Sequence, residues 1–162
     1  VNADINASAN IAYTKMLRAD VPAFHAYSTT SPNSNVTGNN LAYTIAMDEE
    51  LYDQGGNYNT SSFTFTAPVS GVYLLAGACQ LSGVTAAGDN VIFKLVTSNH
   101  TFATNHEDDN NIPSHSTHQL TVATFMDASD TCTITVTGIG ESGNTQDLQM
   151  NGGTYLTGCL IG

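Results

Sequence analysis

From Pro22 onward, apolar and polar residues alternate in short runs, and Gly, Asn and Pro separate these runs. In residues 131–137, for example, Cys132, Ile134 and Val136 alternate with four threonines. Successive side chains of a strand point to opposite faces, so this period of two predicts strands with one buried face. Many short strands without a long amphipathic helix predict an all-β sandwich or jelly roll.

Ten strands are expected, each bounded by turn residues. They cover residues 23–28, 41–47, a short piece at 51–52, 62–66, 71–81, 90–97, 101–104, 118–125, 131–137 and 154–161. In two of these strands the alternation also predicts which side chains share a face. One set is Leu41, Tyr43, Ile45 and Met47, and the other is Phe63 with Phe65, which should point inward together.

The first twenty residues differ from the rest, because they contain no Pro or Gly. Their apolar residues follow the spacing of one face of a short helix: Ile5, Ala9, Ala12 and Met16. We therefore expect a short helical or extended stem over residues 1–20 and one head domain over residues 21–162. A chain of 162 residues can bury one sizeable core.

Residues 71–81 and 155–161 carry apolar side chains on both faces, although a two-layer sandwich buries only one face of each sheet. A symmetric partner is the usual cover for the second face, and we expect a homotrimer. The alternative is that local loops cover it. The residues assigned to the trimer interface or the core are Tyr73, Leu75, Tyr155, Leu156 and Leu160.

The charge of the chain excludes several partners. It has 3 Lys and Arg against 14 Asp and Glu, a net charge of −11, so it should repel nucleic acid. No apolar stretch is long enough to span a bilayer, which predicts no membrane insertion. The first residues do not read as a signal peptide.

The three cysteines, Cys79, Cys132 and Cys159, lie in apolar or alternating runs without a CxxC spacing. This pattern argues against a disulfide framework and against a zinc site. We expect three buried thiols that act as small hydrophobic side chains.

Several segments resemble C1q-like domains of the C1q/TNF group. Asn57-Tyr58-Asn59, followed by the run from Phe63 through Ala67-Pro68 and Gly71 to Tyr73, is similar to the central signature of that family. Residues 155–160 are similar to its last strand, and residues 22–26 to its first. The resemblance implies a ten-stranded jelly roll that forms a tight homotrimer, with both termini at the base.

Two positions depart from the family pattern. Ser129-Asp130 stands where the family usually has Gly-Asp, and Cys159 replaces an aromatic residue.

The segment 3–16 is similar to a stem that precedes the distal domains of phage tail-fibre proteins. Combined with a C1q-like head, it implies a non-enzymatic receptor-binding domain on the virion surface. The implied partners are a second and third copy, a host polysaccharide or surface protein, and other virion proteins. The alternatives are a structural spike or decoration protein, or a secreted C1q-like module. Four sequons, at Asn6, Asn35, Asn59 and Asn99, would fit the secreted module if glycosylated.

If the first strand leaves the base and the last returns to it, the longest polar loops lie at the far end. These loops are 28–40, 83–89, 105–114 and 139–153. The residues assigned to receptor binding are Glu107, Asp108, Asp109, Asn144, Gln146 and Asp147.

No catalytic or cofactor motif accompanies these loops. Glu107, Asp108 and Asp109 are the candidate calcium ligands, but Ile112 and Pro113 break the EF-hand pattern, so a solvated acidic loop is expected. No GxSxG elbow is present. A glycosidase-like carboxylate pair among Glu107, Asp108 and Asp147 is the alternative to a non-enzyme.

The last candidate is a histidine pair. His115 and His118 should face opposite sides of their strand, so the two cannot hold one metal ion within a chain.

Overall fold

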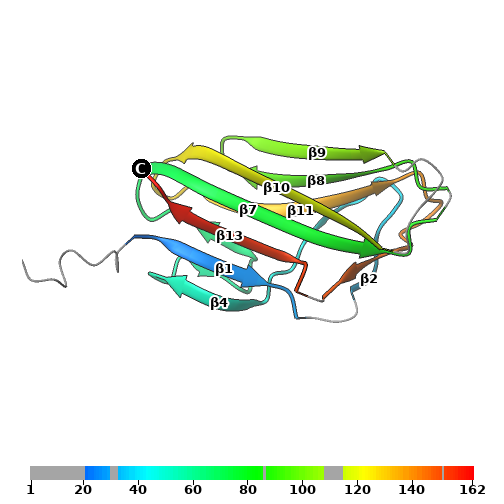
Figure 1. The fold of residues 1–162 in the computed structure, drawn as a ribbon, viewed down its shortest axis with the longest axis horizontal. Helices are drawn as coiled ribbons and strands as arrows, with labels where there is room; N and C mark the ends of the chain where they lie inside the picture. The colour runs from blue at the N-terminus through cyan, green and yellow to red at the C-terminus, as the bar shows by residue number, and fades with distance from the viewer. Residues whose placement is uncertain (1–20, 30–32, 86, 108–114, 151) are drawn as a thin grey trace, which may run out of the picture.

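A computed structural model describes residues 21–29, 33–85, 87–107, 115–150 and 152–162. The predicted stem, residues 1–20, lies outside the described residues. Within these ranges the regular elements are all strands (Figure 1). They are β1 (Ala23–Tyr27), β2 (Asn33–Thr37), β3 (Ala42–Thr44), β4 (Glu49–Gln54), β5 (Tyr58–Asn59), β6 (Thr64–Thr66), β7 (Gly71–Ser82), β8 (Asn90–Thr97), β9 (Thr101–Glu107), β10 (His115–Met126), β11 (Thr131–Ile139), β12 (Gln146–Gln149) and β13 (Tyr155–Leu160).

The strands form two sheets that pack face to face, as the alternation of the sequence predicts. Sheet A has the order β2-β12-β7-β13-β1-β4, and β10 pairs with the other edge of β7. Sheet B has the order β5-β6-β11-β8-β9, and β3 also pairs with β11. All of these pairings are antiparallel. The predicted all-β jelly-roll fold is therefore confirmed.

The core between the sheets is built from alternate residues of each strand. In β7, Tyr73 and Leu75 are fully buried, and in β13 Leu156 is too. Aromatic rings fill the half of the core near the start of β1: the Phe24 ring stacks on Phe65 with a centroid distance of 4.4 Å and on Tyr58 at 5.4 Å. The Tyr58 hydroxyl donates a hydrogen bond of 3.2 Å to the carbonyl of Met47, which satisfies the one polar atom of that ring.

Two predicted faces are wrong in part. Ile45 and Met47 are buried and Tyr43 is half-buried, but Leu41 is exposed. Leu41 lies just before β3, and its carbonyl accepts a hydrogen bond of 2.6 Å from the Thr37 hydroxyl. Phe65 is buried as predicted, whereas Phe63 has a φ of 57°, in the left-handed region, and lies before β6 begins. A residue in that backbone region cannot continue the alternation of a strand.

Both ends of the described chain lie at the same end of the sandwich, which we call the base (Figure 1). Strands β1, β7, β9 and β11 run away from the base, and β8, β10 and β13 run toward it. The described parts of the connections that follow β1, β7 and β11, together with the end of β9, therefore lie at the opposite end, which we call the distal end. The predicted placement of the long loops relative to the termini is confirmed for the described residues.

Candidate functional site

The distal end is held together by strands β2 and β12, which extend sheet A there. These strands pair with each other, and β12 also pairs with the end of β7. The Thr145 amide donates to the Thr37 carbonyl at 3.0 Å, and the Asn40 amide donates to the Gly138 carbonyl at 2.9 Å. Backbone hydrogen bonds thus join β2 and the connection after it to β11 and the connection after it, so this end of the molecule is a structured platform.

Glu141 adds a side-chain link that the sequence pattern does not reveal. Its carboxylate oxygens accept hydrogen bonds from the amide and the hydroxyl of Thr85, at 2.7 and 2.8 Å. Its own amide donates to the carbonyl of Gly38 at 3.0 Å. Because Glu141 is largely buried, it connects the loop after β7 to the loop after β11 rather than facing a ligand.

The six predicted receptor residues have different positions. Glu107 is exposed at the end of β9, while Asp108 and Asp109 lie outside the described residues. Asn144 is half-buried, and its Oδ1 atom is buried. Asp147 is also half-buried, and its Oδ1 atom accepts a hydrogen bond of 2.7 Å from the Asn35 amide. These two residues therefore help to shape the distal loops.

Gln146 requires a correction, because its side chain is fully buried. Gln146 and Leu148 occupy alternate positions of β12 that point into the core, which the prediction of an irregular loop missed. The Gln146 amide covers Gly138 of β11. In this structure it cannot contact a receptor.

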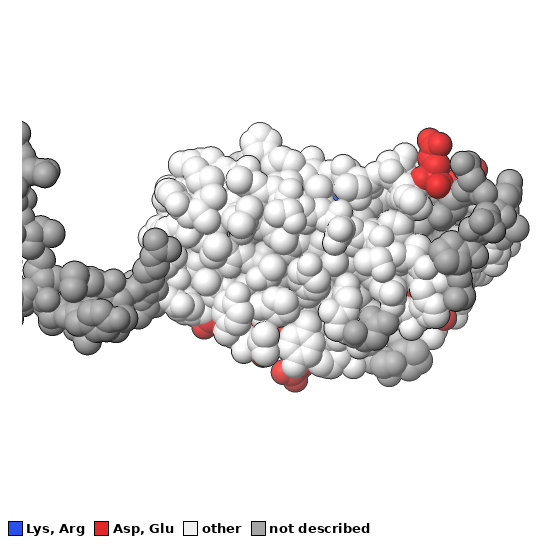
Figure 2. Space-filling view, viewed as in Figure 1, with Lys and Arg blue, Asp and Glu red and all other residues white. Residues whose placement is uncertain are grey.

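Acidic side chains dominate the charged part of the surface. Red patches lie at the distal end and along the lower edge of the molecule, and very little blue is visible (Figure 2). Among the described residues, Lys94 is the one Lys or Arg, because Lys15 and Arg18 belong to residues 1–20. The surface is therefore neutral or acidic where it is described, which disfavours anionic ligands.

A second candidate surface is the outer face of sheet A, the face turned away from sheet B. Val72, Leu74, Phe125 and Ile161 are 36% to 56% exposed. The strand register places Phe125 beside Val72, and Leu74 between Ala123 and Cys159. Clustered apolar side chains of this kind mark an interaction surface.

Among the residues assigned to the interface or the core, Tyr73, Leu75 and Leu156 belong to the core. Tyr155 and Leu160 are half-buried. The prediction that strand 71–81 is apolar on both faces is correct, but Phe125 and Ile161 were not assigned to this surface. Their alternation with Met126 and Leu160 is the signal that could have identified them.

Aromatic rings continue the outer face toward β4. The His25 ring stacks on Tyr155 with a centroid distance of 5.4 Å, and the Tyr52 ring lies 6.2 Å away on its other side. Partial burial lowers the pKa of His25, so the imidazole is neutral at pH 7. Across the neighbouring strands β10, β7, β13 and β1, no charged side chain therefore lies on the outer face between Phe125 and the rings of Tyr155 and His25.

Strands β9 and β10 close one side of the sandwich, and a histidine pair lies between them. His118 is buried and His115 is exposed, so the predicted opposite orientation is confirmed. The His118 ring meets His106 edge to face, with centroids 5.7 Å apart, and its Nε2 atom is 2.9 Å from the Ser116 hydroxyl. Burial, with a smaller contribution from His106, lowers the pKa of His118 to about 4.

The described residues contain no group of three or more His, Cys, Asp or Glu side chains that could hold a metal ion. Calcium binding by Glu107, Asp108 and Asp109 stays a prediction, since two of these residues are not described. Nor does the described part of the chain include a helix long and apolar enough to cross a membrane.

All three cysteines are free thiols in the structure. Cys79 and Cys132 are buried as expected, and burial raises the pKa of both, that of Cys132 to about 12. Cys159 differs from the expectation, because it is only half-buried on the outer face of sheet A.

Comparison with known proteins agrees with this architecture. The C1q domain family model matches residues 23–146. The globular domain of zebrafish complement 1qA superposes with a TM-score of 0.59 at 14% identity, over 88% of this chain and 98% of that chain. Murine APRIL, in its crystal structure at pH 8.5, gives 0.59 at 10% identity, over 87% and 99%. The PRD1 vertex protein P5 gives 0.59 at 12% identity, over 87% and 97%. No curated protein matches the sequence.

Proposed function

Because the chain belongs to the C1q domain family, we propose that it is the trimeric receptor-binding head of a phage tail fibre, which attaches the virion to its host cell. Domains of this family are generally non-enzymatic binding modules, typically trimeric, and usually extracellular or surface-exposed. The proposal adds three specific points: the surface that assembles the trimer, the end that meets the receptor, and the kind of receptor.

The outer face of sheet A is the surface that supports assembly. Leu74 and Phe125 are 40% and 56% exposed there, although the residues that alternate with them in β7 and β10 face the core. Packing this face against a second copy would remove the apolar side chains from water. A cyclic arrangement of three copies would cover the same face on each one.

The observation that carries the proposed function is the position of the distal platform opposite both ends of the described chain (Figure 1). A fibre joined at the base presents this platform to a cell first. Its loops are connected by the hydrogen bonds of Thr37, Gly138 and Glu141, so it would lose little conformational freedom on binding. Three copies of a weak site would add through multivalency.

The receptor is a host polysaccharide or a surface protein. Neutral amide and hydroxyl groups, together with exposed Glu107, suit hydrogen bonding to sugar hydroxyls or to a basic protein surface. The acidic charge disfavours strongly anionic polysaccharides. A structural spike or a secreted C1q-like module would share the assembly face but would not need a receptor-binding distal end.

Adsorption of the purified, folded protein to host cells tests this proposal. One variant replaces Glu107, Asp108 and Asp109 with Ala, and a second replaces Asn144 and Asp147 with Ala. A matched control replaces Thr133 and Thr135, which lie on the outer face of sheet B, with Ala. We expect the distal variants to lose adsorption and the control to keep it. If both distal variants adsorbed as well as the unsubstituted protein, or if only the control lost adsorption, a distal receptor site would be contradicted.

A further inference from the structure

Strands β9 and β10 run along one side of the sandwich, where the two sheets meet (Figure 1). β9 is the last strand of sheet B on that side, and β10 is the last strand of sheet A. Among the described strands, β9 pairs with β8 and β10 pairs with β7, but no backbone ladder joins β9 to β10. In the described part of the chain, side chains therefore hold the sheets together along this β9–β10 seam.

His106 of β9 and His118 of β10 face each other across the seam. Their ring centroids are 5.7 Å apart and the ring planes are inclined by 70°, so the rings are not stacked. His118 is buried, whereas His106 is exposed at the end of its strand. One ring is thus held in place by its surroundings, and the other can turn about its side-chain bonds to align with it.

We propose that His106 and His118 together bind one divalent transition metal ion of the Zn²⁺, Ni²⁺ and Cu²⁺ class, with water in the remaining coordination positions. Imidazole nitrogen suits these ions, whereas Ca²⁺ and Mg²⁺ require oxygen ligands. A Zn–N bond of about 2.0–2.1 Å places the ion about 3.2 Å from the centroid of each ring. Two rings on one ion are then about 5–6 Å apart for bond angles near or somewhat above tetrahedral, and the observed 5.7 Å lies in this range.

The surroundings of His118 suit a metal ligand. Its Nε2 atom is 2.9 Å from the Ser116 hydroxyl, and an Nε2–H group that donates to this oxygen leaves the Nδ1 lone pair for the metal. Burial lowers the pKa of His118 to about 4, so at neutral pH no proton competes with the metal for the ring. Cys79 lies opposite His118 in the strand register, but burial raises the pKa of its thiol, which makes it the poorer ligand.

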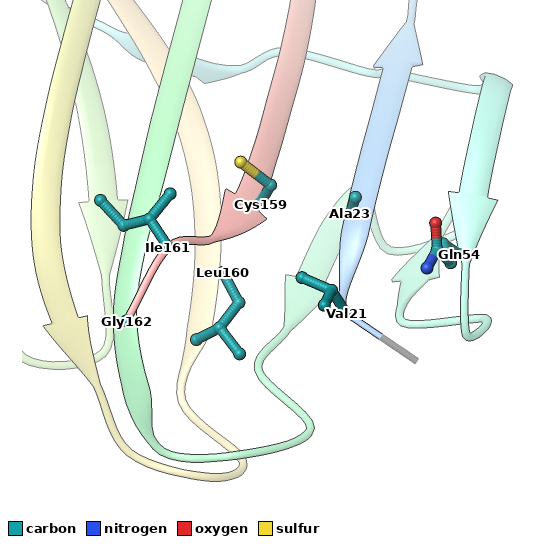
Figure 3. Close-up of a pocket in the computed structure, with 7 residues that line it drawn as sticks. All are labelled: Val21, Ala23, Gln54, Cys159, Leu160, Ile161 and Gly162. Atoms are coloured by element: carbon teal, nitrogen blue, oxygen red, sulfur yellow. The ribbon is translucent and has the colours of Figure 1, made fainter. Parts of the chain in front are cut away.

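The seam is separate from the surface that we assign to contact between copies. That surface is the outer face of sheet A, which includes Cys159 and Ile161 at the shallow hollow near the base (Figure 3). His118 and Ser116 occupy the alternate positions of β10 that point away from this face, into the sandwich. Contact between copies through the outer face would therefore not cover the histidine pair.

A bound ion would connect sheet B to sheet A at a point where the described strands lack a backbone ladder. An ion that binds the folded chain and not the unfolded one stabilises the fold by mass action. The described residues contain no group of three His, Cys, Asp or Glu side chains that could hold a metal, so water would complete the coordination. A site of this open kind should exchange its ion readily and lose it to a chelator.

The experiment titrates Zn²⁺ into the chelator-treated full chain at neutral pH and measures binding by calorimetry. We expect one ion per chain, and the nitrogen resonances of the His106 and His118 rings should both shift in NMR spectra. Each single variant, His106→Gln and His118→Gln, should raise the dissociation constant about tenfold or more, because it removes one of two protein ligands. The melting temperature of the unsubstituted chain should rise by about 3 °C or more in saturating Zn²⁺.

His115→Gln is the matched control, since it changes an exposed histidine of the same strand and should leave the dissociation constant unchanged. His106→Gln alters an exposed side chain, so it tests the site even if His118→Gln destabilises the fold. Absence of Zn²⁺ binding by the unsubstituted chain would overturn the proposal. Binding that persists undiminished in His106→Gln, or that falls equally in His115→Gln, would do the same. Both ligands belong to one chain, so the result does not depend on trimer formation or on host attachment.

Discussion

The side-chain amide of Gln146 packs against the α-carbon of Gly138, in the space that the Cβ atom of a larger residue would occupy. A Cβ at position 138 would lie 2.6 Å from Cδ and 2.7 Å from Nε2 of Gln146. The Gly138 amide also donates a hydrogen bond of 2.8 Å to the Thr37 hydroxyl. Strands β2, β11 and β12 therefore meet at a position that tolerates only glycine.

Gly138→Ala should destabilise the fold, because the added methyl group overlaps a buried side chain that has no free space to enter. We expect a loss of about 1–3 kcal/mol in the free energy of unfolding, measured by urea denaturation. Gly143→Ala is the matched control, since a Cβ there meets no atom within 4 Å. Adding Gln146→Ala to Gly138→Ala should restore part of the loss, and the absence of any such coupling would contradict this contact.

Ser129→Gly should stabilise the protein. Ser129 has a φ of 78°, in the left-handed region, which costs a residue with a side chain about 1–2 kcal/mol. Glycine removes this cost, but its greater freedom in the unfolded chain offsets part of the benefit. We therefore expect the free energy of unfolding, measured by thermal unfolding, to rise by about 0.5–1 kcal/mol. Ser129→Ala keeps the strained backbone and should give no gain; an equal gain in that variant would contradict the argument.

Acid should destabilise the fold through His118. The groups that face its ring are His106 of β9 and the Ser116 hydroxyl, and Cys79 of β7 lies opposite it in the strand register. The folded pKa of about 4 is below the ordinary value of 6.5, so the unfolded chain takes up the proton first as the pH falls. The free energy of unfolding should therefore fall by about 3 kcal/mol as the pH is lowered from 6.5 to about 4.

His118→Gln should remove most of this pH dependence in urea denaturation at fixed protein concentration. His115→Gln changes an exposed residue of the same strand and should retain it. If both variants kept the acid dependence of the parent, another group would be responsible.

The alternation of the sequence was sufficient to predict most of the sandwich. Each of the ten predicted strands corresponds to an observed one, because burial of one face imposes a period of two on the residues of β7, β8 and β11. Strands β2, β5 and β12 were missed, since they are short and rich in Asn and Gln. Their pairing depends on neighbours that are distant in the sequence, as when Gln146 aligns with Thr37.

The candidate site was less predictable than the fold. Polar residues in a loop were assumed to be exposed, but Gln146 is buried and the Asp147 carboxylate accepts a hydrogen bond from the Asn35 amide. These roles follow from contacts between separate loops, which a linear pattern does not contain. That residues 71–81 carry apolar side chains on both faces was predicted, because these residues alternate with core residues along the strand. The exposed members of the outer face, Val72, Leu74, Phe125 and Ile161, were not among the five residues assigned to the interface or the core.

The mass of the full chain in solution tests assembly through the outer face of sheet A most directly. Multi-angle light scattering at micromolar concentration should give three times the 17.0 kDa of one chain. Phe125→Glu, which places a charge on the apolar outer face without entering the core, should give a single folded chain, while Thr135→Glu on sheet B should stay trimeric. A mass of 17.0 kDa for the unsubstituted protein, or an unchanged trimer for Phe125→Glu, would contradict the proposed assembly.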